Sequence, residues 1–328
     1  MEKLYPLKFF PIYKEKIWGG TKLKTILNKD FGNLPNCGES WEISGVKGNE
    51  SIVAEGSLKG MSLPALLKTY KGRLLGEKNF LRYGEEFPLL IKFIDANEDL
   101  SIQVHPDDDL AREKHGSFGK TEMWYIFQAD EGATLITGFN QNLDKESYLK
   151  HFQEGTLNDI LNKEAVQSGD VFFIPAGRVH TIGKGICIAE IQQTSDVTYR
   201  IFDFDRVDSE GRQRELHVED ALEALDFSFH PEYKTPYNEQ DNAPIELVDC
   251  PYFLTRKINL TAPLARDYSG NDSFVLYICY EGGFDIGFDE GKTSVVKGES
   301  VLLPAEIKQV NLQPKPGAGI LEVTIAVR

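Results

Sequence analysis

Short runs of apolar and alternating residues recur along the chain, separated by clusters of glycine, asparagine, aspartate and proline. Runs of this kind, rich in β-branched and aromatic residues and bounded by turn formers, are typical of strands. Many short strands at close spacing favour a sandwich or a barrel. The predicted strands cover residues 40–44, 89–94, 100–105, 123–128, 134–138, 171–175, 186–194 and 199–203. The predicted fold class is therefore mainly β.

Three stretches have helical periodicity instead. Residues 62–75 place Leu63, Leu66 and Leu67 on one stripe, and residues 144–161 and 217–225 show the same spacing of apolar positions. A stripe of this width predicts an amphipathic helix with one buried face. We expect all three to be helical insertions packed against a β framework.

The chain also resembles itself. Residues 169–177 align with residues 298–306, and residues 125–139 resemble residues 275–288 as a strand, an acidic turn with glycine and a second strand. Agreement in both order and content favours a duplicated barrel, with chance similarity of two short hairpins as the alternative.

Residues 229–242 are polar, contain proline and lack any period, which predicts a linker. We therefore divide the chain into residues 1–230, a domain with helical insertions, and residues 231–328, a second β domain.

The amino-acid composition limits the classes of partner that the protein is expected to bind. The formal net charge is −15, from 36 basic and 51 acidic side chains, which argues against binding to nucleic acid or to anionic membranes. An anionic substrate would need a local basic cluster. The first residues lack the apolar core of a signal peptide, no apolar run approaches the ~18 residues that span a bilayer, and the four cysteines form no C-x-x-C pair. We expect a soluble cytoplasmic protein with free thiols.

Side chains of the kinds that bind metal ions lie at or near the ends of several predicted strands. Gln103 and His105 share one face of a strand that Pro106 ends, because side chains alternate along a strand and proline has no N–H to donate. Glu122 opens the next predicted strand, and His180 follows the run from Pro175 to Val179. Imidazole nitrogen and carboxylate oxygen suit a borderline divalent metal such as zinc.

These motifs carry a family resemblance. The spacing Gly169-x5-Pro175-x-Gly177-x2-His180 resembles the second cupin motif, and Gln103-x-His105 with Glu122 resembles a variant of the first. With Trp18-Gly19-Gly20, residues 38–42, 88–108 and 194–200, the chain resembles the type I mannose-6-phosphate isomerases in their short bacterial form. The resemblance implies a double cupin, two jelly-roll barrels, of which the second is degenerate. That second copy has Gln309-Val310 in place of the His-bearing loop, so it is expected to bind no metal.

The resemblance also implies an enzyme that interconverts mannose 6-phosphate and fructose 6-phosphate through a cis-enediol(ate), with one Zn²⁺ per chain. The implied zinc ligands are Gln103, His105, Glu122 and His180. The implied catalytic residues are Lys120, Arg200 and Glu190, of which Glu190 is the expected proton-transfer base if its pKa is tuned towards neutrality. The expected partner is the sugar phosphate, and the expected assembly is a monomer or a weak homodimer.

Several details stay open at this stage. Glu190 would face water if the other face of its strand were core. Ile182 and residues 202–206 depart from the pattern of longer members, so the phosphate contact could fall to Arg200, Lys92, Lys120 or Arg206. Trp18 and Trp41 are expected to be packing residues outside the site.

Two other functions fit the same residues. Two histidines and one carboxylate are also the pattern of an iron-dependent cupin dioxygenase. The third possibility is a non-catalytic sugar-phosphate-binding cupin. A fourth ligand and the cations Lys120 and Arg200 favour the isomerase over the dioxygenase. An intact set of metal ligands favours the isomerase over the non-catalytic sugar-phosphate-binding cupin.

Overall fold

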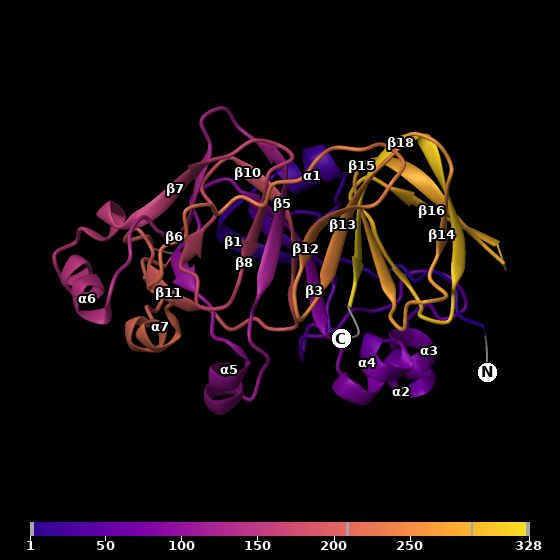
Figure 1. Cartoon of the computed structure of the whole chain (residues 1–328), viewed down its shortest axis with the longest axis horizontal. Helices are drawn as coiled ribbons and strands as arrows, with labels where there is room; N and C mark the ends of the chain where they lie inside the picture. The colour runs from indigo at the N-terminus through magenta and orange to yellow at the C-terminus, as the bar shows by residue number, and fades with distance from the viewer. Residues whose placement is uncertain (1–2, 208–209, 290, 326–328) are drawn as a thin grey trace.

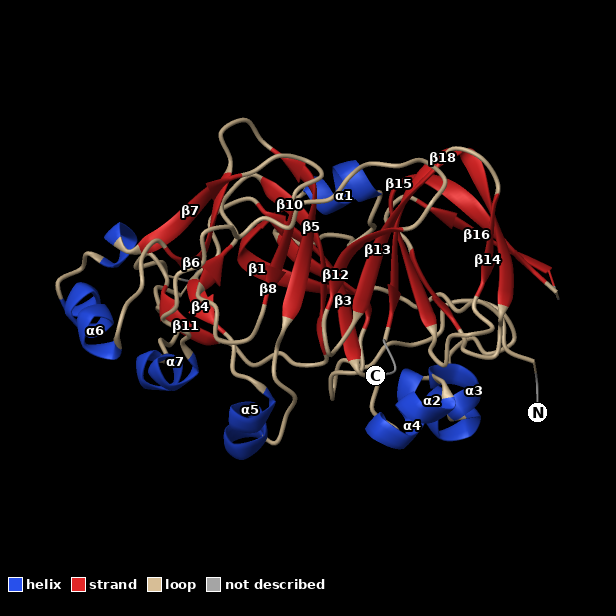
Figure 2. Cartoon of the chain, viewed as in Figure 1, coloured by secondary structure: helices blue, strands red, loops and turns tan. Residues whose placement is uncertain are grey.

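The computed structural model describes residues 3–207, 210–289 and 291–325. Within them, three antiparallel sheets form the body of the molecule (Figure 1), with helices around them (Figure 2). The first sheet has six strands in the order β1 (Ile12–Gly20), β2 (Cys37–Ile43), β3 (Leu89–Ala96), β10 (Ile186–Gln193), β5 (Glu122–Ala129) and β8 (Val171–Ile174). The prediction of a mainly β fold is confirmed.

A five-stranded sheet lies against one face of the first. Its order is β11 (Tyr199–Phe202), β4 (Ile102–Val104), β9 (His180–Thr181), β6 (Thr134–Phe139) and β7 (Leu161–Ala165). Ile94 and Ile188 of the six-stranded sheet share a buried cluster with Leu135 of the five-stranded sheet, so apolar side chains hold the two faces together. Helices α6 (Lys145–Gln153) and α7 (Val218–Ala224) cover the outer face through Tyr148 and Ala221.

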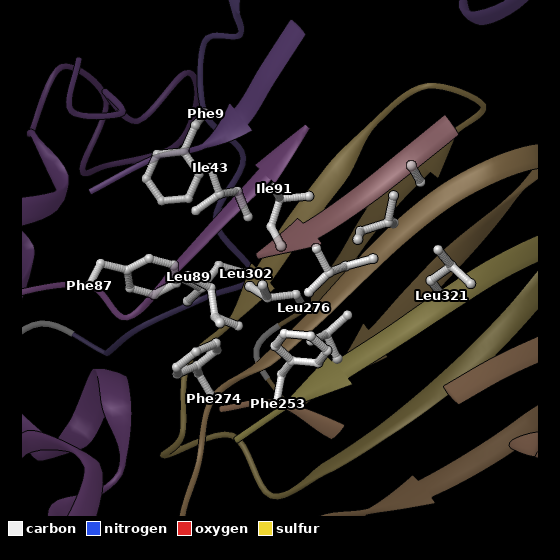
Figure 3. Packing of buried hydrophobic residues seen from close by; sticks show 14 of the residues in the cluster. Phe9, Ile43, Phe87, Leu89, Ile91, Phe253, Phe274, Leu276, Leu302 and Leu321 are labelled. Atoms are coloured by element: carbon white, nitrogen blue, oxygen red, sulfur yellow. The ribbon is translucent and has the colours of Figure 1, made fainter. Parts of the chain in front are cut away.

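The third sheet packs on the opposite face of the six-stranded sheet. It contains β12 (Ile245–Asp249), β13 (Leu254–Leu260), β18 (Gln309–Thr324), β15 (Val275–Phe288) and β16 (Gly291–Val296), with β14 (Leu264–Asp267) paired to β18 and β17 (Ser300–Leu303) paired to β15. Figure 3 shows Leu89 and Ile91 of β3 packed beside Leu276 and Leu302 of the C-terminal sheet. The six-stranded sheet is therefore buried on both faces.

The remaining helices join the two halves or lie at the edges. Helices α2 (Leu63–Tyr70), α3 (Gly72–Leu75) and α4 (Glu77–Tyr83) lie beside the C-terminal sheet (Figure 1), and the Phe274 N–H donates to the Leu75 carbonyl over 3.2 Å. Helix α1 (Lys22–Leu27) follows β1, and α5 (Asp108–His115) begins at Asp107, whose side chain accepts from the Leu110 N–H over 2.9 Å.

The predicted helices differ from the observed ones in two places. Residues 62–75 form two helices, because Lys71 adopts φ 51° and ends the first. Residues 144–161 form α6, a 3₁₀ turn (η1, Leu157–Asp159) and then the first residue of β7, because the chain turns at Gly155, whose φ is +70°. The packing of the helices on β sheets is as expected, but α2 and α3 pack on the C-terminal sheet.

The internal duplication has a structural counterpart. The Ile126 N–H donates to the Asp170 carbonyl, and the Gly169 N–H donates to the Ile126 carbonyl. In the C-terminal sheet, the Cys279 N–H donates to the Glu299 carbonyl, and the Gly298 N–H donates to the Cys279 carbonyl. These bonds make Ile126 the structural counterpart of Cys279, because pairing register sets equivalence in a sheet.

The division of the chain into two domains at residues 230 and 231 stays a prediction. The N-terminal segment contacts the second half of the chain, since Leu7 and Leu302 exchange backbone hydrogen bonds of 2.8 and 2.9 Å. Cys37, Cys187 and Cys279 are buried free thiols. No helix in residues 3–207, 210–289 and 291–325 has the length and apolar character needed to cross a membrane.

Candidate active site

A cavity of about 250 Å³ opens between the six-stranded and five-stranded sheets. Its walls carry charged and aromatic groups from several of the motifs. The lining residues include Lys16, Trp18, Glu39, Trp41, Lys92, Gln103, Lys120, Trp124, Glu190, Asp196, Thr198, Arg200 and Arg214. A site this rich in charge differs from an ordinary apolar ligand pocket and suits a polar, charged substrate.

One wall is a row of side chains across the six-stranded sheet. Trp41 is paired in register with Lys92, Lys92 with Glu190, and Glu190 with Trp124. Residues directly opposite each other on neighbouring strands point to the same face, so all four side chains reach the cavity. Lys92 Nζ lies 2.9 Å from Glu190 Oε2, and Trp124 Nε1 donates to Glu190 Oε1 over 3.1 Å.

The facing wall is built in the same way from the five-stranded sheet. Gln103 is paired in register with Arg200 on one side and with His180 on the other. Gln103 Nε2 lies 3.3 Å from His180 Nε2. His105 follows the last residue of β4 and shares the face of Gln103, as the alternation along the strand predicts.

His105, Glu122 and His180 form a buried cluster whose ligand atoms all lie within 4.8 Å of one another. Glu122 Oε2 is 3.6 Å from His105 Nε2, and Glu122 Oε1 is 3.4 Å from His180 Nε2. The Nδ1 atoms of His105 and His180 lie 3.0 and 2.8 Å from the carbonyl oxygens of Val197 and Arg178. Because a carbonyl can only accept, each Nδ1 carries the proton and each Nε2 keeps a free lone pair.

The donor set fits a divalent metal ion. Glu122 Oε2 is buried and has no hydrogen-bond partner among the described residues, which is costly unless a cation satisfies it. Lys120 Nζ lies 3.0 Å from His105 Nε2 and 3.6 Å from Glu122 Oε2, so a positive charge already lies against the cluster. The described residues thus include a triad with the donor atoms needed to hold a metal ion, with the amide of Gln103 beside it.

The ionisation states of the two histidines agree with a metal-binding role. Burial lowers the pKa of His180 to about 4 and that of His105 well below its usual range, so both imidazoles are neutral, the form that binds metals. Burial and the neighbouring Glu190 raise the pKa of Glu122 to about 8. Burial also lowers the pKa of Lys120.

Glu190 lies inside the cavity and does not face water. It is only 3% exposed, because the five-stranded sheet covers the face of β10 that carries Ile188 and Glu190, while the C-terminal sheet covers the opposite face through Ala189 and Ile191. Burial acts to raise the pKa of Glu190, but Lys92 and Lys120 outweigh it and lower that pKa. This direction is opposite to the shift towards neutrality expected for a tuned base.

The basic residues that were candidates for the phosphate contact divide into two groups. Lys120, Arg200 and Lys92 line the cavity, with Lys92 engaged by Glu190. Arg206 is directed elsewhere, because its guanidinium pairs with Asp203 at 2.5 Å and donates to the Asp99 carbonyl.

Several lining residues lay outside the expected site. Trp18 and Trp41 are buried, as expected of packing residues, but they also form part of the cavity wall. Glu39 accepts from Trp41 Nε1 over 2.6 Å and lies 3.3 Å from Lys16 Nζ. Glu39 lies in residues 38–42, one of the segments that carry the family resemblance, whereas Arg214 lies in a segment without any period.

Comparisons with known proteins agree with this geometry. The model of the phosphomannose isomerase type I catalytic domain matches residues 7–139, and that of the mannose-6-phosphate isomerase cupin domain matches residues 244–317. The mannose-6-phosphate isomerase ManA of Bacillus subtilis (strain 168) is 37% identical over 314 residues, which cover 94% of this chain and 96% of the relative. The mannose-6-phosphate isomerase of Streptococcus mutans is 37% identical over 299 residues, 90% of each chain.

A solved structure extends the likeness to the whole fold. The crystal structure of the mannose 6-phosphate isomerase from Bacillus subtilis superposes with a TM-score of 0.87 at 32% identity, over 97% of this chain and 99% of that one. The cupin match in the C-terminal third agrees with the predicted double cupin. Sequence, fold and cavity together show that the chain belongs to the type I phosphomannose isomerase family.

Proposed function

We propose that this enzyme interconverts mannose 6-phosphate and fructose 6-phosphate with one Zn²⁺ held by Gln103, His105, Glu122 and His180. The observation that carries the proposal is the convergence of His105, Glu122 and His180 on one another, in contact with Gln103 and Lys120, which line the cavity together with Glu190. Membership of the family supports the reaction, since two relatives that match over at least 90% of this chain bear the name mannose-6-phosphate isomerase.

Zinc is the metal that the family resemblance implies, and two imidazoles, one carboxylate and a neutral amide suit it. When bound, a zinc ion supplies Lewis acidity that polarises a carbonyl or hydroxyl oxygen. The protein supplies the rest. The carbonyl oxygens of Val197 and Arg178 fix the two imidazole rings, so that both Nε2 atoms point into the same space.

Glu190 is the proposed group that takes a proton from one of the two reacting carbons and returns it to the other. Its lowered pKa keeps it ionised at neutral pH, which a base requires, although a lower pKa also makes it a weaker base. Lys92 and Trp124 each hold one of its oxygens, so the carboxylate has a fixed orientation in the wall.

Lys120 and Arg200 are the proposed cations that stabilise the charge developing on the enediolate oxygens. Both line the cavity, and loss of one such donor typically reduces the rate by about 10²–10³. Sugar phosphate is the expected class of substrate. The oligomeric state stays a prediction of a monomer or a weak homodimer.

The test is a coupled isomerase assay on purified protein loaded with zinc, on the protein stripped by a chelator, and on the stripped protein with zinc restored. We expect activity with mannose 6-phosphate that disappears on stripping, returns with zinc and does not depend on oxygen. Full activity in the stripped protein, or no conversion in the zinc-loaded protein, would contradict the proposal.

A further inference from the structure

Arg214 lies outside every motif of the sequence, yet its side chain lines the cavity together with Arg200 and Thr198. It belongs to the segment between β11 and α7, where no apolar period predicts a fixed structure. A second arginine at this place therefore needs a separate explanation.

The guanidinium of Arg214 is held in a fixed orientation. Its Nε donates to Asp203 Oδ2 over 2.7 Å and its Nη2 donates to Asp203 Oδ1 over 2.5 Å. Asp203 is 5% exposed, and Arg206 binds it from the other side. A guanidinium has five N–H donors, so this two-bond pair leaves Arg214 with donors for another acceptor.

The cluster has an excess of positive charge. Arg200, Arg206 and Arg214 surround the single buried carboxylate of Asp203, and the pKa of Arg200 is lowered first by burial and then by Arg214. Arg200 donates from Nη1 to the Glu215 carbonyl over 2.7 Å, while its Nε is buried without a partner among the described residues. The carboxylate of Asp196 also lines the cavity, and the Glu215 side chain is 84% exposed and screened by solvent.

A local excess of positive charge, in a chain whose net charge is −15, favours the binding of an anion at this cluster. Arg200 is paired in register with Gln103, so Arg200 lies beside the metal-ligand cluster, and Arg214 lines the same cavity. An open-chain sugar bound at the ligand cluster can therefore extend its phosphate towards them.

We propose that Arg214 binds the phosphate group of the substrate together with Arg200, and that Asp203 positions Arg214 for it. The inference rests on the proposed function. Arg206 is not among the described residues that line the cavity, and Asp203 and the Asp99 carbonyl engage it.

The experiment compares Arg214→Gln and Arg214→Lys with the unaltered zinc enzyme. The measurements are KM and kcat for mannose 6-phosphate, the inhibition constant of inorganic phosphate, and the zinc content. We expect the glutamine variant to raise both KM and the inhibition constant by ~10- to 100-fold, with a larger effect on KM than on kcat and unchanged zinc. Lysine keeps the charge but not the paired donors, so it should recover only part of the loss.

Arg212→Gln is the matched control. Arg212 lies two residues away, pairs with Glu210 and is 69% exposed, so its variant should leave both constants unchanged. Asp203→Asn should weaken phosphate binding less than Arg214→Gln, because it releases the guanidinium without removing it. Unchanged inhibition by phosphate in both folded Arg214 variants would overturn the proposal.

Direct calorimetric titration with inorganic phosphate separates this proposal from the isomerase proposal. If the unaltered protein binds phosphate through Arg214 but does not convert mannose 6-phosphate, then only the proposed reaction fails. If it isomerises the sugar and Arg214→Gln binds phosphate as tightly as before, then only the role of Arg214 fails.

Discussion

Lys92 Nζ and Glu190 Oε2 lie 2.9 Å apart on neighbouring strands, in a wall buried on both sides. The two side chains are 6% and 4% exposed. Two buried charges cost desolvation free energy that only their mutual attraction and further hydrogen bonds offset. Trp124 supplies one such bond to Glu190, so the pair depends on the register of three strands.

Removing one partner should therefore destabilise the protein strongly. Lys92→Met leaves the Glu190 carboxylate buried and unpaired, and we expect the free energy of unfolding to fall by ~3–5 kcal/mol. Urea denaturation measures this change. The double variant Lys92→Met/Glu190→Gln removes both charges and should recover much of the loss, whereas equal stability of the single and double variants would mean that the two charges are not coupled.

Glu190→Gln tests the proposed base. The amide keeps the size of the side chain but cannot take a proton, so kcat should fall by ~10²–10⁴ while the zinc content stays unchanged. The assay is run at a temperature where circular dichroism shows the variant folded, because Lys92 then lacks its partner. A kcat within threefold of the unaltered enzyme would assign proton transfer to another group.

Glu39 should contribute a pH-dependent part of the stability. Burial raises its pKa, but Lys92, Lys16 and Trp41 outweigh burial and lower it from 4.5 to about 2. The folded state thus binds this proton less tightly than the unfolded chain, so the contribution is fully present above about pH 5 and is lost as the pH falls towards 2. From the size of this shift it amounts to roughly 3 kcal/mol.

The measurement is the free energy of unfolding of the unaltered protein and of Glu39→Gln between pH 6 and pH 3. Protonation of metal ligands affects both proteins alike, so their difference reports Glu39. The glutamine variant should be less stable at pH 6 and lose less stability on acidification. Parallel profiles would show that the pKa of Glu39 is unshifted in the folded protein.

Phe274 should couple the N-terminal and C-terminal halves. Its ring lies 5.0 Å from that of Phe87 and is fully buried between the helices and the sheets (Figure 3). Phe274→Ala should lower the free energy of unfolding by ~3–5 kcal/mol in one cooperative transition, without changing KM at low temperature. Leu81→Ala, at an 84% exposed position of α4, should change stability by less than about 0.5 kcal/mol. Two separate transitions in the Phe274 variant would show that the halves unfold independently.

The strands and the ligand positions could be predicted because each has a local signal. Period-two alternation places Gln103 and His105 on one face, and the structure has them there. Strand β1 was not predicted, because its IYKEKIWGG sequence carries few apolar residues and its pairing with β2 is interrupted by bulges. Helix α5 begins at an aspartate run that has the composition of a turn.

The rest of the site depends on contacts that no local pattern encodes. Alternation along β10 could divide its residues into two faces but could not show that both are buried, which is what places Glu190 in the cavity. Arg214 reaches the cavity only because Asp203, eleven positions earlier in the chain, holds it. Pairings of this kind are decided by tertiary structure.

The most direct test of the account is elemental analysis combined with the isomerase assay on the unaltered protein and on His180→Ala. His230→Ala, at a half-exposed histidine outside the cluster, is the control. We predict about one zinc per chain and full activity in the unaltered protein and the control, and loss of both in His180→Ala, because one of three converging ligands is removed. An active His180→Ala enzyme, or one that retains its full zinc content, would contradict the central claim.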